Sequence, residues 1–177
     1  MLHRNQFVQV KTTCSNSGLI GYSNISEINN NPKAIPFTET FTNIGDLGGW
    51  SVSGGFGIGA LRGATGNPGN NALVNLYSTN TTGSITTQKY GPITAGKEIK
   101  FDYKMSNFSS PYAAPASGSG NVVVLVSTDC GATFTTVNTF TNDGIAGYRS
   151  KSVSLASYVG NDVVIRITGN WTSGDYD

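Results

Sequence analysis

Residues 122–134 read VVVLVSTDCGATF, and this stretch decides the fold class. Its first five residues are all apolar and four are β-branched, a run too short for a typical helix and typical of a central strand buried on both faces. The residues that follow predict a tight turn in which Asp129 accepts hydrogen bonds from backbone amides, Gly131 adopts a positive φ and Phe134 packs beneath. The stretch therefore predicts a β-hairpin in which Asp129 and Gly131 have a structural role.

The same alternation of strand and turn continues on both sides of this hairpin. Further strands are predicted over residues 37–41, 50–52, 72–77, 84–90, 98–105, 134–140, 150–155 and 162–168. Residues 54–71 are too rich in glycine to hold regular structure for long, and a helical turn is expected only near residues 155–158. Turn signals recur about every 10–15 residues, a spacing typical of an antiparallel sandwich or barrel.

The composition excludes several other classes of protein. Gly, Ser, Thr and Asn make up 80 of the 177 residues, whereas charged residues make up only 12%. Helical bundles need more Ala, Leu, Glu and Lys, and disordered chains carry fewer than the 18 aromatic residues found here. A net charge of +1 gives no basic footprint for nucleic acid, and no apolar run approaches the length of a membrane span. The chain is therefore expected to be an all-β protein of a kind common outside the cell.

The chain divides into three parts by pattern. Residues 1–28 predict one hairpin, residues 29–34 a polar linker, and residues 35–177 the main domain. A single hairpin is too small to bury a core of its own, so it resembles the end of a preceding domain. Cys14 and Cys130 fall in different parts, and the sequence leaves open whether they pair or stay reduced.

Catalytic side chains are scarce in the main domain. The single histidine is His3, so a Ser-His-Asp or Cys-His arrangement within residues 35–177 is excluded, and one histidine with two distant cysteines is a poor zinc site. No spacing among the acidic residues indicates a glycosidase pair. We expect no enzymatic activity from this segment.

Two kinds of binding site are candidates. A structural calcium ion is bound by carboxylate oxygens, and the candidate ligands are Glu39, Asp46 and Asp175. Glu39 lies in the first predicted strand of the main domain and Asp175 at its C-terminal end. The first and last strands of a jelly-roll sandwich are often neighbours, so these two carboxylates are expected to lie close together. The alternative is that these acids are solvated surface groups. Tyr112, in a loop rich in Ser, Pro, Ala and Gly, is the best exposed aromatic candidate for contact with a sugar.

Several motifs resemble known families. Residues 7–14 (FVQVKTTC) followed by residues 21–24 (GYSN) are similar to the last two strands of a bacterial fibronectin type III domain. The remainder resembles the adhesin-type domains of Bacteroidetes surface proteins, in the choice-of-anchor J and cleaved-adhesin group, which are related in shape to MAM domains. The segments that carry this resemblance are residues 35–41 (IPFTETF), 49–50 (GW), 99–103 (IKFDY), 124–134 (VLVSTDCGATF) and 154–167 (SLASYVGNDVVIRI).

The resemblance implies a β-sandwich with jelly-roll topology, exported to the cell surface, often by type IX secretion. It implies a non-catalytic adhesion module of a large multidomain protein, whose partners are neighbouring domains and a host-cell or matrix glycan or protein. The alternative is an accessory carbohydrate-binding module of a secreted hydrolase or peptidase. Two departures stand out: residues 51–56 lack the acids of the family's calcium loop, and the sequence stops where the family's last strand begins.

Overall fold

Antiparallel strands dominate the computed structural model of the protein, and the expected all-β fold class is confirmed. The structure describes residues 6–13, 20–24, 26–28, 31–41, 49–60 and 70–177. Within these ranges the only helical element is the 3₁₀ turn η1 (Ala156–Tyr158), close to where a helical turn was predicted. The chain divides into two compact units, Met1–Pro32 and Lys33–Asp177.

The first unit is a hairpin made of two short antiparallel ladders. Its strands are β1 (Gln6–Val8) paired with β4 (Ser26–Ile28), and β2 (Lys11–Thr13) paired with β3 (Ile20–Tyr22). Between the two ladders, the backbone N–H of Ser23 donates to the carbonyl oxygen of Val10 at 2.9 Å, and the Ser23 hydroxyl accepts from the Val10 N–H. Ser23 therefore links the two ladders into one hairpin.

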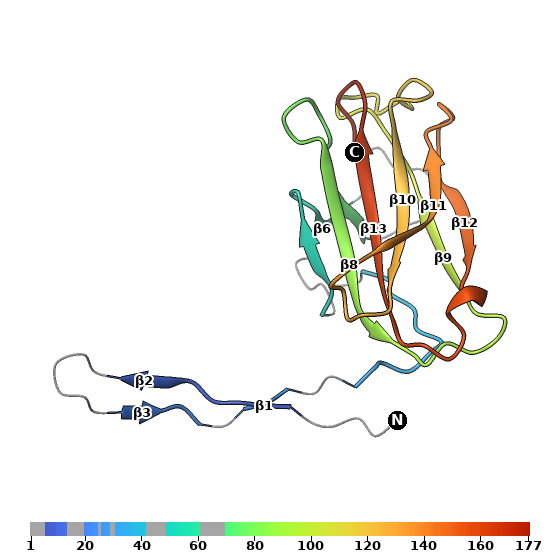
Figure 1. Ribbon diagram of the computed structural model, residues 1–177. Helices are drawn as coiled ribbons and strands as arrows, with labels where there is room; N and C mark the ends of the chain where they lie inside the picture. Colours follow the sequence, from blue (N-terminus) through green and yellow to red (C-terminus); the bar gives the residue numbers. More distant parts are fainter. Residues whose placement is uncertain (1–5, 14–19, 25, 29–30, 42–48, 61–69) are drawn as a thin grey trace. The chain divides into compact units, whose positions relative to one another are not determined.

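A five-stranded antiparallel sheet forms the first layer of the second unit (Figure 1). Its order is β11 (Thr135–Thr141), β10 (Gly120–Ser127), β13 (Val163–Trp171), β8 (Thr82–Tyr90) and β5 (Ser51–Ser53). The middle strand, β13, pairs with two strands that are far from it in sequence. The sheet therefore brings the two halves of the domain together.

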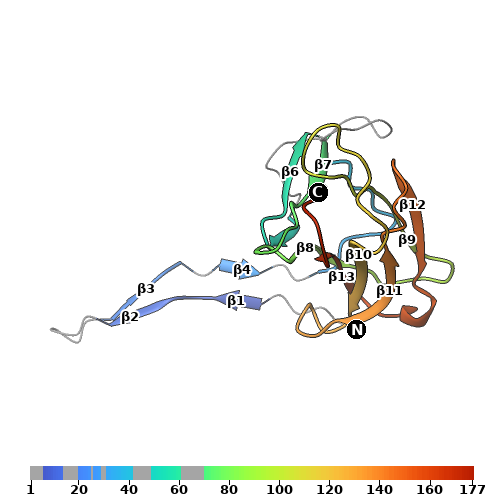
Figure 2. The same cartoon turned by 90° about the horizontal axis from the view of Figure 1, so that it is seen from above.

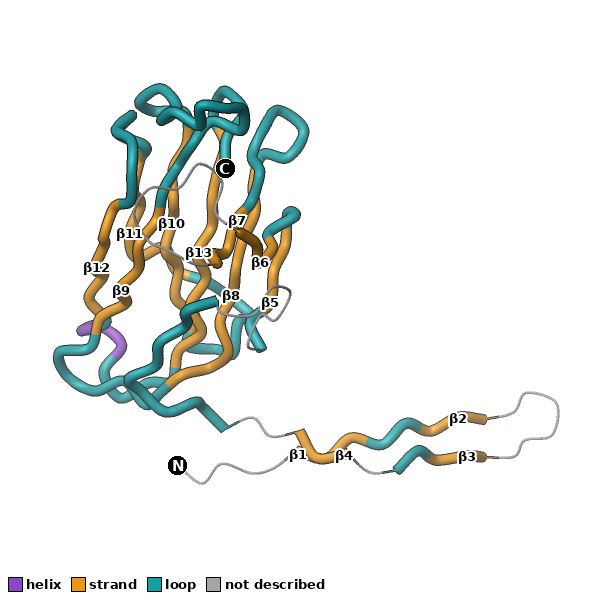
Figure 3. The backbone as a smooth tube through the Cα atoms, turned by 180° about the vertical axis from the view of Figure 1, so that it is seen from behind, coloured by secondary structure: helices purple, strands orange, loops and turns teal. Residues whose placement is uncertain are grey.

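Two strand pairs form the second layer. They are β9 (Glu98–Tyr103) with β12 (Arg149–Ser154), and β6 (Gly57–Ala60) with β7 (Asn70–Leu73). Both pairs lie on the same side of the five-stranded sheet, as Figures 2 and 3 show. The arrangement is sandwich-like, with the core between the layers.

The last three residues connect the two pairs of the second layer. Tyr176 forms antiparallel bridges with Leu76, which follows β7, and with Asn107, which follows β9. The Tyr176 side chain is completely buried. The C-terminal segment thus lies as a short strand between the two pairs at one end of the sandwich.

The core consists of two clusters. One holds Val74, Leu76, Met105, Val122 and Tyr176 near the C-terminus, and the other holds Ile93, Val126, Leu155 and Val163 toward the opposite end. Each fully buried aliphatic side chain of this size stabilises the fold by about 1.5–3 kcal/mol relative to exposure. The inward-facing valines of β10 contribute to both clusters and so join them.

Two local expectations from the sequence are corrected by the structure. The run Val122–Val126 is buried on one face only, because Val123 and Leu125 lie half-buried on the outer face. Phe37–Phe41 is not a strand. Its Phe37 ring instead packs on Tyr90, with ring centroids 4.9 Å apart. In its described part, the glycine-rich segment contains the four-residue strand β6, which pairs with β7 and agrees with the expectation that regular structure there is short.

The second unit begins at Lys33, two residues before the predicted start of the main domain. Its N–H donates to the Lys89 carbonyl oxygen at 2.8 Å, and its own carbonyl oxygen accepts from the Gly91 N–H at 3.1 Å. These bonds form a parallel bridge between Lys33 and Tyr90. The bridge explains why part of the predicted linker belongs to this unit.

Candidate functional site

A row of three outward-facing residues lies at the C-terminal end of the second layer. Tyr176 forms antiparallel bridges with both Leu76 and Asn107. One residue further along each segment, Asp175 is therefore paired with Tyr77 on one side and with Phe108 on the other. Their side chains point opposite to the buried Tyr176, since side chains alternate along a strand. Tyr77 and Phe108 are each 39% exposed. We name this set the aromatic row.

Backbone and side-chain hydrogen bonds fix the aromatic row. The N–H of Phe108 donates to the carbonyl oxygen of Asp175 at 3.1 Å, and Asn75 Nδ2 donates to Asp175 Oδ1 at 2.8 Å. Tyr77 and Asn80 close a two-residue turn through reciprocal backbone bonds of 3.1 and 2.8 Å. Tyr77 and Phe108 lie on the two segments that flank the Asp175 segment. Their backbones are therefore separated by two strand spacings, or about 10 Å. The exposed carboxylate of Asp175 thus lies between two aromatic residues.

Tyr112 belongs to the loop that starts at Phe108. The Asn107 N–H donates to the Ala113 carbonyl oxygen at 2.7 Å and closes this loop, while the Tyr112 N–H donates to the Ser109 carbonyl oxygen at 2.9 Å. Tyr112 has a φ of +56° and is half-buried. The predicted ligand residue is therefore in the same small loop as Phe108, but it is less exposed than the sequence indicates.

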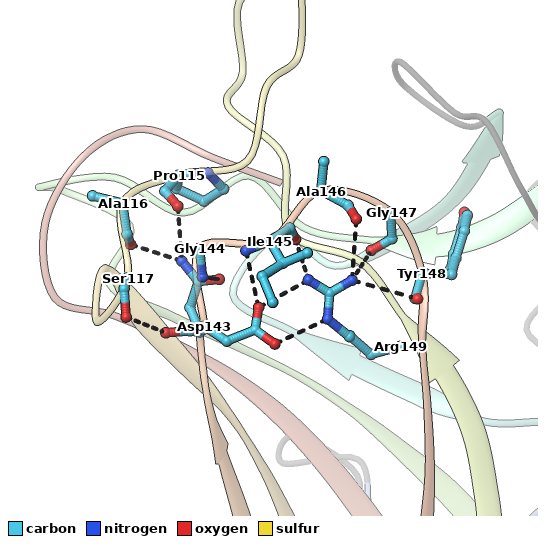
Figure 4. A network of polar contacts seen from close by, with 11 residues as sticks. Pro115, Ala116, Ser117, Asp143, Gly144, Ile145, Ala146, Gly147, Tyr148 and Arg149 are labelled. Atoms are coloured by element: carbon cyan, nitrogen blue, oxygen red, sulfur yellow. Dashed lines mark hydrogen bonds and ion pairs between the residues drawn. The ribbon is translucent and has the colours of Figure 1, made fainter.

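A second loop at the same end is held by one ion pair (Figure 4). Arg149 Nε donates to Asp143 Oδ2 at 3.0 Å and Arg149 Nη2 donates to Asp143 Oδ1 at 2.8 Å. The guanidinium also donates to the carbonyl oxygens of Ile145 and Gly147. Its hydrogen bonds hold the pKa of the Asp143 carboxyl well below its usual range. This fixed loop presents Ile145, which is 64% exposed.

Asn142 joins this loop to the loop that carries Tyr112. Its buried Nδ2 donates to the carbonyl oxygens of Pro115 and Ala116, at 3.2 and 2.8 Å. Its Oδ1 accepts from the Gly144 N–H at 3.1 Å. The loops at this end therefore form one ordered surface rather than independent segments.

The turn after β10 lies at the opposite end of the sandwich. Ser127 Oγ donates to Asp129 Oδ1 at 2.6 Å and Thr133 Oγ1 donates to Asp129 Oδ2 at 2.6 Å, while the Thr133 N–H donates to both carboxylate oxygens. These bonds from Ser127 and Thr133 lower the pKa of Asp129 to about 2. Gly131 has a φ of +89°, and its Cα faces the ring of Phe134. Every contact of Asp129 serves the turn.

The structure does not bring the three proposed calcium ligands together. Glu39 accepts a hydrogen bond from the Phe41 N–H at 2.7 Å. It lies near Tyr90, because burial and the charge of Glu39 both raise the pKa of the Tyr90 phenol. Asp175, in contrast, accepts a hydrogen bond from Asn75. These places lie at opposite ends of β8, roughly 25 Å apart at the usual rise per residue. Asp46 lies outside the described residues. Across the described ranges, no three His, Cys, Asp or Glu side chains are grouped so that they could hold a metal ion.

Cys130 is exposed and unpaired in the β10–β11 turn, with a φ of +61°. Cys14 and His3 lie outside the described residues.

Sequence reasoning missed Tyr77, Phe108 and Ile145. Tyr77 is the last residue of the strand predicted over residues 72–77, and Tyr112 is the only aromatic candidate that the sequence analysis names in the loop that also holds Phe108. The available signal was Phe108 itself, a large aromatic residue among Ser, Pro and Ala. The pairing that aligns it with Tyr77 depends on the C-terminal segment and has no local signature.

Comparisons with known proteins give no relative. No family model, no curated protein and no solved structure matches the chain. Separately, none of the helices in the described part of the chain is long and apolar enough to cross a membrane.

Proposed function

We propose that the chain is a non-catalytic extracellular binding module that acts in adhesion, as part of a larger surface or secreted protein. The aromatic row is the observation that carries this proposal. Tyr77 and Phe108 expose aromatic surface at one end of the sandwich, and Asp175 places a carboxylate between them. Aromatic side chains of this kind supply much of the energy at binding surfaces because they bury large areas with little loss of rotamer entropy.

The order of the supporting loops favours binding with little rearrangement. Asp143 and Arg149 fix one loop, Asn142 joins it to the next, and Tyr176 anchors the segment that carries Asp175. A surface that is already ordered loses less entropy when a ligand binds. The end surface is therefore the part of the domain most suited to recognition.

The test is a binding screen with a matched pair of variants. The full chain is applied to immobilised matrix proteins, glycans and host cells, alongside the Tyr77→Ala/Phe108→Ala double variant and Val159→Ala. Val159 is a matched control because it is an exposed apolar residue, 48% accessible, at the opposite end of the domain. The proposal expects a ligand that the double variant loses and Val159→Ala retains. Failure of the wild-type chain to bind any of these surfaces would contradict it.

A second candidate function is an accessory carbohydrate-binding module of a secreted hydrolase or peptidase. The observation in its favour is the pairing of the Asp175 carboxylate with the Asn75 amide beside the two aromatic side chains. Sugars are bound by stacking on aromatic rings and by hydrogen bonds to such polar groups. Binding confined to the glycan arm of the screen, lost in Asp175→Ala, would favour this candidate over protein adhesion.

The finer topology proposed is a jelly roll. Its support is the sheet order, in which β13 separates β10 from β8, together with the antiparallel pairing of every strand of the five-stranded sheet. The C-terminal strand between β7 and β9 segments is consistent with a second sheet in the same sandwich.

A further inference from the structure

The outer face of the five-stranded sheet carries ordered rows of hydroxyl and amide groups. Thr82 Oγ1 donates to Asn170 Oδ1, and Asn170 Nδ2 donates to Asn121 Oδ1, both at 3.0 Å. One row further along the strands, the hydroxyls of Ser84 and Thr168 are 2.9 Å apart. Successive rows on one face are about 7 Å apart. This polar face is separate from the aromatic row, which belongs to the other layer.

Arg166 forms the next row, and two contacts fix its guanidinium. Its Nε donates to Thr86 Oγ1 at 3.0 Å, and its Cζ lies 3.8 Å from the ring centroid of Phe134. Phe134 is the aromatic residue that follows the Asp129 turn. The turn thus supplies the ring on which the cation rests, and both contacts limit the rotamers of Arg166.

The two contacts that fix this guanidinium do not use its terminal amino groups. The hydrogen bond to Thr86 is made by Nε, and the Phe134 ring packs at Cζ. Lys89 adds a second cation on the same face, with Nζ 4.0 Å from the Asp162 carboxylate. A planar guanidinium binds a carboxylate through two parallel hydrogen bonds.

We propose that this face binds an acidic saccharide, with the carboxylate of a uronic acid paired to Arg166 and the sugar hydroxyls bonded to the adjacent rows. Ser84, Thr168 and Asn170 provide donors and acceptors at successive levels beside the cation. Half-buried Val123 and Leu125 lie beside Thr168 and Arg166 on the same face, so apolar side chains border the polar rows. The rows of hydroxyl and amide groups next to the cation match the hydroxyl-rich surface and the carboxylate of such a sugar. The inference concerns a different face from the proposed function and stands without it.

The test is titration of the full chain with a hexagalacturonate by calorimetry. Wild type is compared with Arg166→Gln, Arg166→Lys and the charge-matched control Lys100→Gln. Lys100 is 75% exposed on β9 in the other layer, so its removal changes net charge without touching this face. Thermal melts of each variant check that it folds. Arg166→Lys keeps the positive charge but replaces the planar guanidinium, with its two parallel donors, by a single ammonium group.

The expected result is saturable binding that weakens about tenfold or more in Arg166→Gln, and less in Arg166→Lys, as loss of charge-assisted hydrogen bonds predicts. Lys100→Gln should bind as wild type does, and a neutral cellohexaose should not bind. Absence of hexagalacturonate binding, equal affinity of Arg166→Gln, or equal loss in Lys100→Gln would overturn the proposal. Binding of a polyglutamate peptide in place of the saccharide would overturn it as well.

Discussion

The phenol of Tyr176 donates a hydrogen bond of 2.5 Å to the backbone carbonyl oxygen of Ser119. The same hydroxyl lies 3.2 Å from the carbonyl oxygen of Asn170, at the end of the middle strand β13. Burial raises the pKa of this phenol, so it remains protonated as a donor. This residue therefore links the C-terminal segment both to the second layer by backbone bridges and to the first layer by its side chain.

Replacement of Tyr176 tests that link. Tyr176→Phe removes the phenol's hydrogen bond to the Ser119 carbonyl oxygen, which still accepts from the N–H groups of Thr172 and Ser173. The free energy of unfolding should therefore fall by about 0.5–1.5 kcal/mol, as for loss of one hydrogen bond. Tyr176→Ala also empties part of the core and should cost about 3–5 kcal/mol. Urea denaturation measures both, with Tyr22→Phe, at an exposed tyrosine of the first unit, as the control. An unchanged midpoint in Tyr176→Phe would contradict this role of the hydroxyl.

Gly144 is expected to be intolerant of a side chain. Its φ is +76°, and a Cβ would lie 3.0 Å from the backbone nitrogen of Ser117. Gly118 has a similar φ of +81° but open space around it. Left-handed backbone costs a non-glycine residue about 1–2 kcal/mol, so Gly118→Ala should lose about that amount and Gly144→Ala more. Chemical denaturation of the two variants measures the difference; equal losses would show that the contact with Ser117 is unimportant.

Acid should weaken the Asp129 turn within a defined pH range. The folded-state pKa of Asp129 is about 2, below the ordinary value of 3.8, so the unfolded chain binds a proton more readily. Its contribution to stability is therefore complete above about pH 4 and is lost as the pH falls through 2. Thermal melts of wild type and Asp129→Asn should differ most above pH 4 and converge toward pH 2. A difference in Tm that does not change with pH would contradict this.

The all-β class and the β10–β11 turn were predictable because their signals are local. Asp129, Gly131 and Phe134 occur within six residues, and the hydrogen bonds of the Asp129 carboxylate are made to Ser127 and Thr133 in the same short segment. The 3₁₀ turn Ala156–Tyr158 likewise matches its local prediction. Runs of β-branched residues such as Val122–Val126 were enough to predict that strands would form there.

The conformation of residues 37–41, the aromatic row and the positions of the acidic residues depend on contacts between segments that are distant in the sequence. Phe37–Phe41 alternates like a strand, but its aromatic residues pack individually, with the Phe41 ring edge-on to Trp50 at 5.7 Å between centroids. The aromatic row exists only because Tyr176 pairs with two segments that lie far from it in the chain. Glu39 and Asp175 are each near a chain end of the domain, yet the strand directions place them at opposite ends of β8.

The most direct test of the binding role is the dissociation constant of the first ligand found in the screen. Surface plasmon resonance would compare wild type, Tyr77→Ala/Phe108→Ala and Val159→Ala. Loss of two partly exposed aromatic side chains should weaken binding by about tenfold or more, since each such anchor typically contributes over 1 kcal/mol. Val159→Ala should match wild type. Equal affinity of the double variant and the wild type would contradict the assignment of binding to the aromatic row.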